Sequence, residues 1–210
     1  MSFFWSRFLS VSGEKPISPP MFFSCLPTLE TDDLVLRRPR LKDAKDVFSY
    51  ASDKEVARYV LWTPHRSIAE TRSCLRELIH RARRGYPSSW AVVHRGTGRV
   101  IGTIGFVWYS HENHSAEIGY SLSREYWNHG YATQAVRAVI SRAFSDLPLN
   151  RIEAQHDLRN PASGKVLEKS GFRKEGILRS RIVNKGEYID VALYAILKED
   201  MNTVSLSDQR

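Results

Sequence analysis

With 210 residues and 42% hydrophobic side chains, the chain is long enough to bury a substantial core and too apolar for global disorder. Its formal net charge of +8 favours an anionic partner, whether nucleic acid, an acidic protein or a phosphorylated cofactor. Cys25 and Cys74 are too few for a disulfide framework or a cysteine zinc site, and no apolar run is long enough to span a bilayer. We therefore expect a cytoplasmic protein that makes no use of a membrane.

The first 26 residues differ from the rest of the chain. They contain aromatic residues without clear periodicity, interrupted by a stretch rich in Pro, Ser and Gly. A secretory signal would need a longer apolar stretch and a small-residue cleavage site. We expect residues 1–26 to form an extension, either flexible or docked through Phe3, Phe4 and Trp5, followed by a domain over 27–200 and a tail over 201–210.

Hydrophobic periodicity and turn residues divide the remaining chain into strands and helices. Ser67 and Glu70 form a capping box, which marks the start of a helix, and Gly85 marks its end. The predicted elements in chain order are a strand at 34–38, helices at 41–52 and 68–84, strands at 89–94, 99–109 and 115–122, a helix at 132–147, a strand at 151–157, a short helix at 161–170, and strands at 173–178 and 188–197. This order predicts a single α/β domain with a mixed central sheet flanked by helices, antiparallel in its N-terminal half.

The stretch YWNHGYATQAV, residues 126–136, places a lone glycine between a predicted strand and a predicted helix. The first backbone N–H groups of a helix have no intrahelical partners and attract anions. Small side chains at Gly130 and Ala132 would let a phosphate approach those N–H groups. The alternative is that Gly130 only relieves a turn. The stretch matches neither the dinucleotide fingerprint nor the P-loop.

The order of motifs closely resembles the GCN5-related N-acetyltransferase (GNAT) superfamily, and within it the ribosomal-protein alanine and serine N-terminal acetyltransferases. The motifs that carry the resemblance over roughly residues 28–200 are LVLRRPRLKDA, IGTIGF, AEIGYSL, YWNHGYATQA, NPAS and VLEKSGF. The resemblance implies a GNAT-like fold with a splayed parallel pair of strands at the acetyl-CoA site. It also implies acetyl-CoA as cosubstrate, with no metal.

The resemblance further implies which residues hold the cofactor. Backbone amides in the loop and first helical turn would bind its pyrophosphate, although Trp127 stands where the family usually has Gln or Arg, and a protonated His129 would add charge there. On the strand, amides after Tyr120, near Leu122, would face the thioester oxygen, while Asn160 would bind the pantetheine arm and Ser163 would lie near the sulfur. The residues of the pyrophosphate loop are Asn128, His129, Gly130, Tyr131, Ala132 and Thr133.

Glu117 is the candidate general base. It shares one face of an alternating strand with Gly119 and Ser121, beside the path expected for the pantetheine arm. Glu117 would take the proton of the acceptor amine directly or through a water. Alternatively, Glu117 is an exposed strand residue, and Asn160 does no more than cap a helix. Tyr120 and Tyr126 are other candidate proton donors. His111 and His114 have a spacing that metal sites use, but no third ligand lies nearby in sequence.

We predict direct acetyl transfer in a ternary complex, because no Cys or Ser lies in a recognisable nucleophile motif. The expected acceptor is a protein N-terminal α-amine, with a ribosomal protein as the expected partner. A small amine (polyamine, aminoglycoside or amino-acid-like) and a noncatalytic binding protein are the alternatives. The expected acceptor segments, 60–66 and 179–187, contain Arg179, Arg181 and Lys185, which disfavour polycations and favour acidic or neutral peptides. Direct nucleic-acid binding is not expected, and the protein would be a monomer or a homodimer.

Overall fold

A computed structural model describes residues 17–201, so Phe3, Phe4 and Trp5 and residues 202–210 lie outside the described part. The helices are α1 (Pro19–Ser24), α2 (Ala44–Ala51), α3 (Lys54–Ala57), α4 (Ile68–Arg83), α5 (Tyr131–Asp146) and α6 (Pro161–Lys169). The strands are β1 (Leu29–Glu30), β2 (Leu34–Arg37), β3 (Ser89–His94), β4 (Val100–Ser110), β5 (Ser115–Leu122), β6 (Arg151–Asp157), β7 (Arg173–Asn184) and β8 (Glu187–Leu197). None of the described helices is long and apolar enough to cross a membrane.

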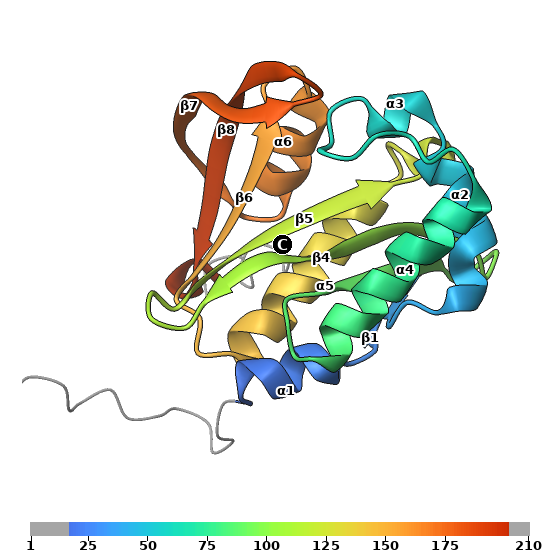
Figure 1. Cartoon of the computed structure of the whole chain (residues 1–210). Coiled ribbons are helices and arrows are strands. Elements are labelled where there is room, and N and C mark those ends of the chain that lie inside the picture. Colours follow the sequence, from blue (N-terminus) through green and yellow to red (C-terminus); the bar gives the residue numbers. More distant parts are fainter. Residues whose placement is uncertain (1–16, 202–210) are drawn as a thin grey trace, which may run out of the picture.

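The eight strands form one mixed sheet in the order β1-β2-β3-β4-β5-β6-β8-β7. Every neighbouring pair is antiparallel except β5 and β6, which confirms the predicted fold class. The parallel pair is hydrogen-bonded only where residues 115–117 face residues 151–153. Beyond that point the two strands diverge, as Figure 1 shows. The sheet therefore opens at its centre, between β5 and β6.

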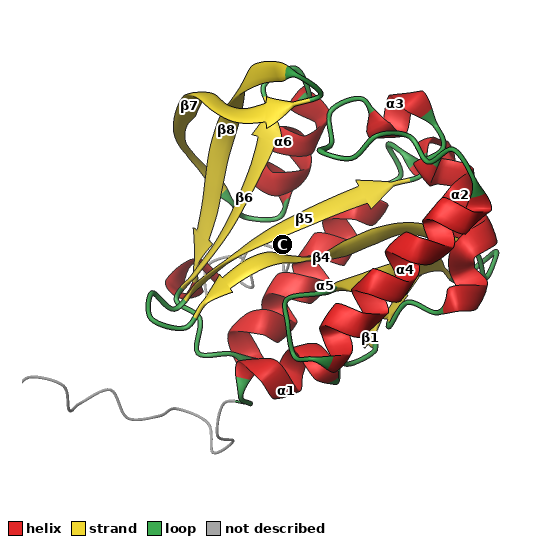
Figure 2. Cartoon of the chain, in the orientation of Figure 1, coloured by secondary structure: helices red, strands yellow, loops and turns green. Residues whose placement is uncertain are grey.

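Helices cover both faces of the sheet (Figure 2). On one face α5 packs its apolar stripe against β2, β4 and β5, because the buried side chains recur at helical spacing. On the other face α2 and α4 pack over β3 and β4 in a second, smaller cluster. The split between β5 and β6 therefore lies between a layer that contains α5 and a layer that contains α2 and α4.

Helix α1 belongs to the core, although the sequence assigned it to an extension. Phe22 and Phe23 are only 2% and 1% exposed. Their rings make edge-to-face contacts with each other and with Phe106, and Phe22 also contacts Trp90. A helix of 6 residues is too short to produce a periodic pattern, so the sequence does not reveal this packing.

The last hairpin is longer than predicted. The strand expected at 173–178 continues as β7 to Asn184, and the pairing register with β8 shifts between Leu178 and Ile182. Ser180, inside this shift, has a positive φ of 47°. The bulge interrupts the alternation of apolar and polar residues, which is why the pattern appeared to stop at residue 178.

Candidate active site

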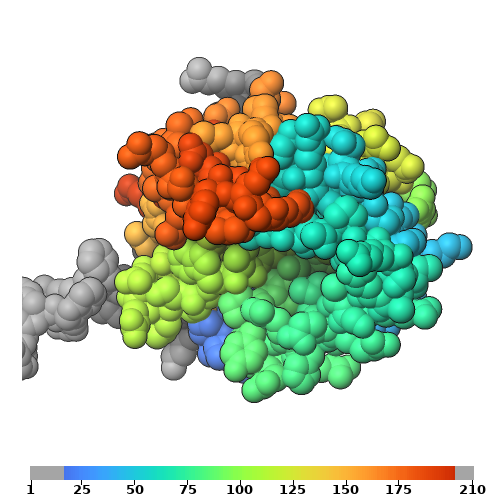
Figure 3. All heavy atoms as spheres, turned by 45° about the horizontal axis from the view of Figure 1, so that its top comes forward, coloured from blue at the N-terminus to red at the C-terminus, as the bar shows by residue number. Residues whose placement is uncertain are grey.

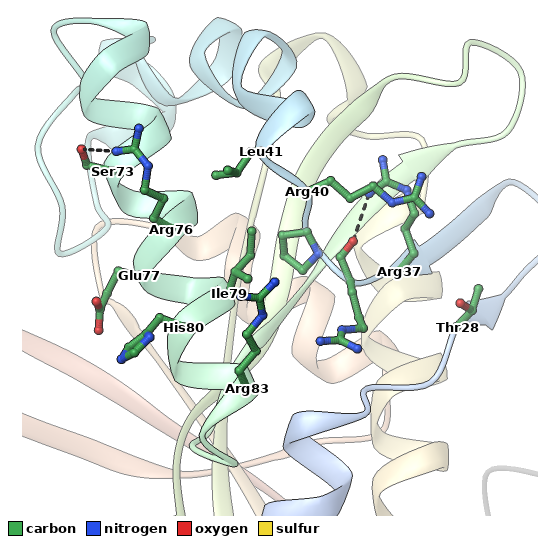
Figure 4. A pocket seen from close by; sticks show the side chains of 12 residues that line it. Thr28, Arg37, Arg40, Leu41, Ser73, Arg76, Glu77, Ile79, His80 and Arg83 are labelled. Carbon is green, nitrogen blue, oxygen red and sulfur yellow. Dashed lines mark hydrogen bonds between the residues drawn. The ribbon is translucent and has the colours of Figure 1, made fainter.

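A large cavity lies beside α4 and is lined mainly by basic side chains (Figure 4). It measures about 1050 Å³, and the segment after β2 and one face of α4 form its walls. Arg76, His80 and Arg83 line it from α4, and Glu77 is the one acidic residue among its described lining. A protonated amine would be repelled there, so this groove is poorly suited to an amine acceptor.

The smaller cavity, of about 390 Å³, opens where β5 and β6 diverge. It brings together four residues that the sequence singled out separately, namely Glu117 and Tyr120 on β5 and Asn160 and Ser163 at the start of α6. Chain segments more than 40 residues apart meet here because the parallel pair places α6 against the end of β5.

Glu117 is buried, with 9% of its surface exposed, so the interpretation as a solvent-exposed strand residue is wrong. Trp108 Nε1 donates a hydrogen bond to Glu117 Oε2 at 2.6 Å, and Gln155 Nε2 donates one to Oε1 at 3.0 Å. Trp108 lies opposite Glu117 on β4, and Gln155 reaches it from β6. These two bonds fix the carboxylate at the point where the sheet opens.

Sequence reasoning missed both partners of Glu117. Neither Trp108 nor Gln155 is among the site residues that the sequence predicts. A register shift between Phe106 and Trp108 places Trp108 opposite Glu117. The alternation pattern could not reveal this pairing.

Gly130 begins α5 with a φ of +81°, and Asn128 also has a positive φ, of 64°. The turn therefore requires a left-handed conformation at Gly130. A Cβ added to Gly130 would meet no atom within 4 Å, so the space in front of this helix start is open. Gly130 therefore permits the turn, and its lack of a side chain leaves open space in front of the first amides of α5.

Trp127 has a structural contact in this loop. Its Nε1 donates to the carbonyl oxygen of Leu122 at 2.8 Å, which ties the loop to the end of β5. His129 Nδ1 lies 2.7 Å from the carbonyl oxygen of Trp127, and the His129 ring stacks on Tyr131 with centroids 5.5 Å apart. Leu122 and residues 128–133 are not among the lining of the cavity; Leu122 ends β5, residues 128–130 precede α5, and residues 131–133 form its first turn.

Asn160 begins α6 without a capping hydrogen bond from its side chain, so the predicted side-chain cap is wrong. Asn160 is among the residues that line the cavity. Nearby, Tyr120 Oη lies 2.9 Å from Ser163 Oγ and 3.0 Å from the Ser163 carbonyl oxygen. Burial raises the pKa of Tyr120 to about 12, against the opposing effect of its hydrogen bond with Ser163, so the phenol stays protonated at neutral pH.

The expectation that the Lys185 ammonium group faces the acceptor is wrong. Lys185 Nζ donates to the carbonyl oxygens of Ala57, Arg58 and Val60 at 2.6, 3.2 and 3.0 Å. Its ammonium group is therefore bound within the protein. Arg179 and Arg181 do not line the cavity, and the two acceptor segments supply apolar side chains instead. Those side chains are Val60, Leu61, Trp62 and Ile182.

Lys185 holds the tip of the β7–β8 hairpin against residues 57–60, and Figure 3 shows the two segments meeting at the surface. We expect Lys185→Met to raise the acceptor KM roughly tenfold, because the hairpin wall would move, and to leave acetyl-CoA affinity unchanged. The exposed Lys174, on β7, gives the matched control Lys174→Met. An unchanged acceptor KM in Lys185→Met would show that the contact is not needed to shape the acceptor side.

His111 and His114 lie in the hairpin between β4 and β5. Their ring centroids are 6.1 Å apart, and His114 Nδ1 lies 2.7 Å from the carbonyl oxygen of Pro148. Across residues 17–201 no three His, Cys, Asp or Glu side chains are grouped so that they could hold a metal ion.

A family model described as an acetyltransferase (GNAT) domain matches residues 33–173. The chain belongs to the GNAT family. Its resemblance to this superfamily and its enzyme class are thereby confirmed: it is an acetyl-CoA-dependent N-acetyltransferase.

Several known proteins match this GNAT protein over more than half of its length. An uncharacterized N-acetyltransferase, p20, of Bacillus licheniformis is 38% identical over 173 residues, which is 82% of this chain and 97% of the relative. A GNAT-family acetyltransferase structure from Bacillus anthracis has a TM-score of 0.74 at 30% identity, covering 82% of this chain and 99% of that one. The ribosomal-protein-serine acetyltransferase of Escherichia coli is 30% identical over 126 residues, covering 60% and 69% of the two chains.

Proposed function

We propose that this GNAT enzyme transfers the acetyl group directly to a protein N-terminal α-amine, of the kind found on ribosomal proteins. The observation that supports transfer to an amine is the buried Glu117 carboxylate, held by two hydrogen bonds at the opening between β5 and β6. The similarity to a ribosomal-protein-serine acetyltransferase supports the choice of acceptor.

The residues of the α5–α6 face fit the cofactor. The open, left-handed turn at Gly130 and the free amides that follow it would hold the pyrophosphate, and the uncapped Asn160 side chain would bind the arm. Acetyl-CoA supplies an acetyl group activated as a thioester. Amides near Leu122, at the end of β5, would face the carbonyl oxygen of that thioester.

Glu117 would accept the proton of the acceptor amine, directly or through one water. Each of its carboxylate oxygens already accepts one hydrogen bond and keeps a second lone pair free. Trp108 and Gln155 would thereby set the direction of the remaining lone pairs. Their role is to position Glu117, whereas Glu117 itself would touch the amine.

Ser163 and Tyr120 would hold a proton at the other end of the reaction centre. The contact of 2.9 Å between their hydroxyl oxygens allows one hydroxyl to donate to the other. Because burial keeps Tyr120 protonated, its hydroxyl would donate a hydrogen bond to Ser163 Oγ, and Ser163 Oγ would donate one to the leaving thiolate.

The acceptor can be tested by following thiol release from acetyl-CoA. We expect N-terminal peptides with neutral residues at the second and third positions to react with higher kcat/KM than matched peptides with Lys or Arg there. The apolar wall of Val60, Leu61 and Ile182 offers no counter-charge for a cation. Spermidine, a small polycation, should be a poor acceptor. If spermidine exceeds every peptide in kcat/KM, the protein-acceptor proposal is wrong.

A small neutral amine is the second candidate acceptor, because the same apolar wall would bind an apolar amine as well as a peptide side chain. The assay separates it by including aromatic and aliphatic monoamines beside the peptides. If the folded protein binds acetyl-CoA but none of the tested amines causes thiol release, the protein is instead a noncatalytic binder. We place the reaction in the cytoplasm, where the exposed free thiols of Cys25 and Cys74 would stay reduced.

A further inference from the structure

His156 contains an unpaired, buried hydrogen-bond acceptor in the wall of the cavity. Its Nδ1 lies 2.8 Å from the carbonyl oxygen of Asp157, and a carbonyl oxygen can only accept a hydrogen bond. Nδ1 therefore carries the proton and Nε2 carries the lone pair. Nε2 is buried and has no hydrogen-bond partner among the described residues. A buried acceptor without a partner lowers stability, so the site is complete only when a donor reaches Nε2.

His156 Nε2 lies on the side of the sheet that α6 covers, against Gly164. Glu117 pairs with Glu153 at the last register position of the parallel pair, so His156 lies three residues further along β6. Tyr120 lies three residues further along β5, at the other edge of the opening. Tyr120 contacts Ser163 of α6, and the His156 ring approaches Gly164 of the same helix.

Neighbouring hydroxyl groups do not satisfy Nε2. Tyr194, whose ring centroid lies 5.5 Å from that of His156, donates its hydroxyl proton to Glu168 Oε1 at 3.0 Å. The Tyr120 hydroxyl is engaged by Ser163. A Cβ added to Gly164 would lie 2.8 Å from Nε2, so the glycine is what allows the imidazole to occupy this place.

We propose that His156 Nε2 accepts a hydrogen bond from an amide N–H of the pantetheine arm of acetyl-CoA. The arm carries two amide N–H donors, and the protein would bind the arm in the opening between β5 and β6. Asn160, at the start of α6, lines the same cavity and would contact the arm next to His156. The inference rests on the proposed placement of acetyl-CoA on the α5–α6 face.

The decisive comparison uses two ligands, CoA and 3′,5′-ADP, which carries the nucleotide phosphates but lacks the arm. Calorimetric titration of His156→Leu should show CoA binding weakened about fivefold to tenfold, the effect of one lost hydrogen bond, with 3′,5′-ADP affinity unchanged. His156→Gln should recover part of the CoA affinity, since its amide oxygen can accept a bond. His111→Leu, in the β4–β5 hairpin, is the matched control and should affect neither ligand.

A second variant approaches the same atom from the helix. Gly164→Ala keeps His156 but places a methyl group where Nε2 lies, and alanine in a helix does not weaken the helix itself. Gly164→Ala should weaken CoA binding and leave 3′,5′-ADP binding unchanged, the same result that is expected for His156→Leu. Unchanged CoA affinity in His156→Leu, or equal weakening of both ligands, would overturn the inference about His156. Failure of the parent protein to bind either ligand would overturn the cofactor placement instead.

Discussion

Glutamine at position 117 is expected to lower kcat by about 10²–10⁴ and to leave acetyl-CoA affinity nearly unchanged, because an amide cannot take the proton of the amine. The substitution keeps the shape of the side chain. Trp108 Nε1 can still donate its hydrogen bond if the new amide turns its oxygen toward Nε1. Gln155 can then rotate its own amide and accept from the new N–H₂ group, so the hydrogen bonds around position 117 survive.

The measurement is steady-state thiol release together with titration of acetyl-CoA binding. Glu153→Gln provides the matched control, because Glu153 pairs with Glu117 in the register of the parallel strands but is bound by Arg151. This control should keep a kcat close to that of the parent. A Glu117→Gln variant that turns over like the parent across the pH range would show that Glu117 is only a buried strand residue.

Gly130→Val is expected to abolish measurable acetyl-CoA binding. Valine is branched at Cβ and resists the left-handed conformation that the turn adopts, with its φ of +81°. Its side chain would also fill the open space before the first amides of α5, where the pyrophosphate is proposed to bind. Two effects thus act together, one on the backbone and one on access.

A glycine in another turn separates these two effects. Gly98, in the β3–β4 turn, also has a positive φ, of 66°, and a Cβ there meets nothing within 4 Å. Gly98→Val therefore imposes a comparable backbone strain away from α5, and should retain acetyl-CoA binding. Gly130→Asn, whose side chain tolerates a left-handed backbone, should weaken binding by blocking access alone. Tight CoA binding by a correctly folded Gly130→Val protein would refute the assignment of this loop.

Local patterns allowed the sequence to predict much of this protein. A helix start needs only its own first turn, and Ser67 caps α4 as predicted, with its hydroxyl accepting from the Glu70 N–H. The Glu70 side chain accepts a hydrogen bond from the N–H of Arg66, whereas a capping box would bring it to the N–H of Ser67. The sequence also predicted the alternating strand around Glu117 and the tight turn at Gly130, because strand faces and tight turns depend on neighbouring residues. Placing these motifs in one site required the resemblance to a known family.

Tertiary structure alone decided what surrounds those motifs. The bonds from Trp108 and Gln155 to Glu117 depend on a bulge and on a parallel register. The Lys185 ammonium, expected to face the acceptor, is bound by carbonyl groups from residues more than 120 positions away. Periodicity determined which elements form and which residues face the core, since these are short-range properties of the chain. Which side chains meet across the sheet, and which donor or acceptor is left without a partner, is a long-range property that only the packed fold determines.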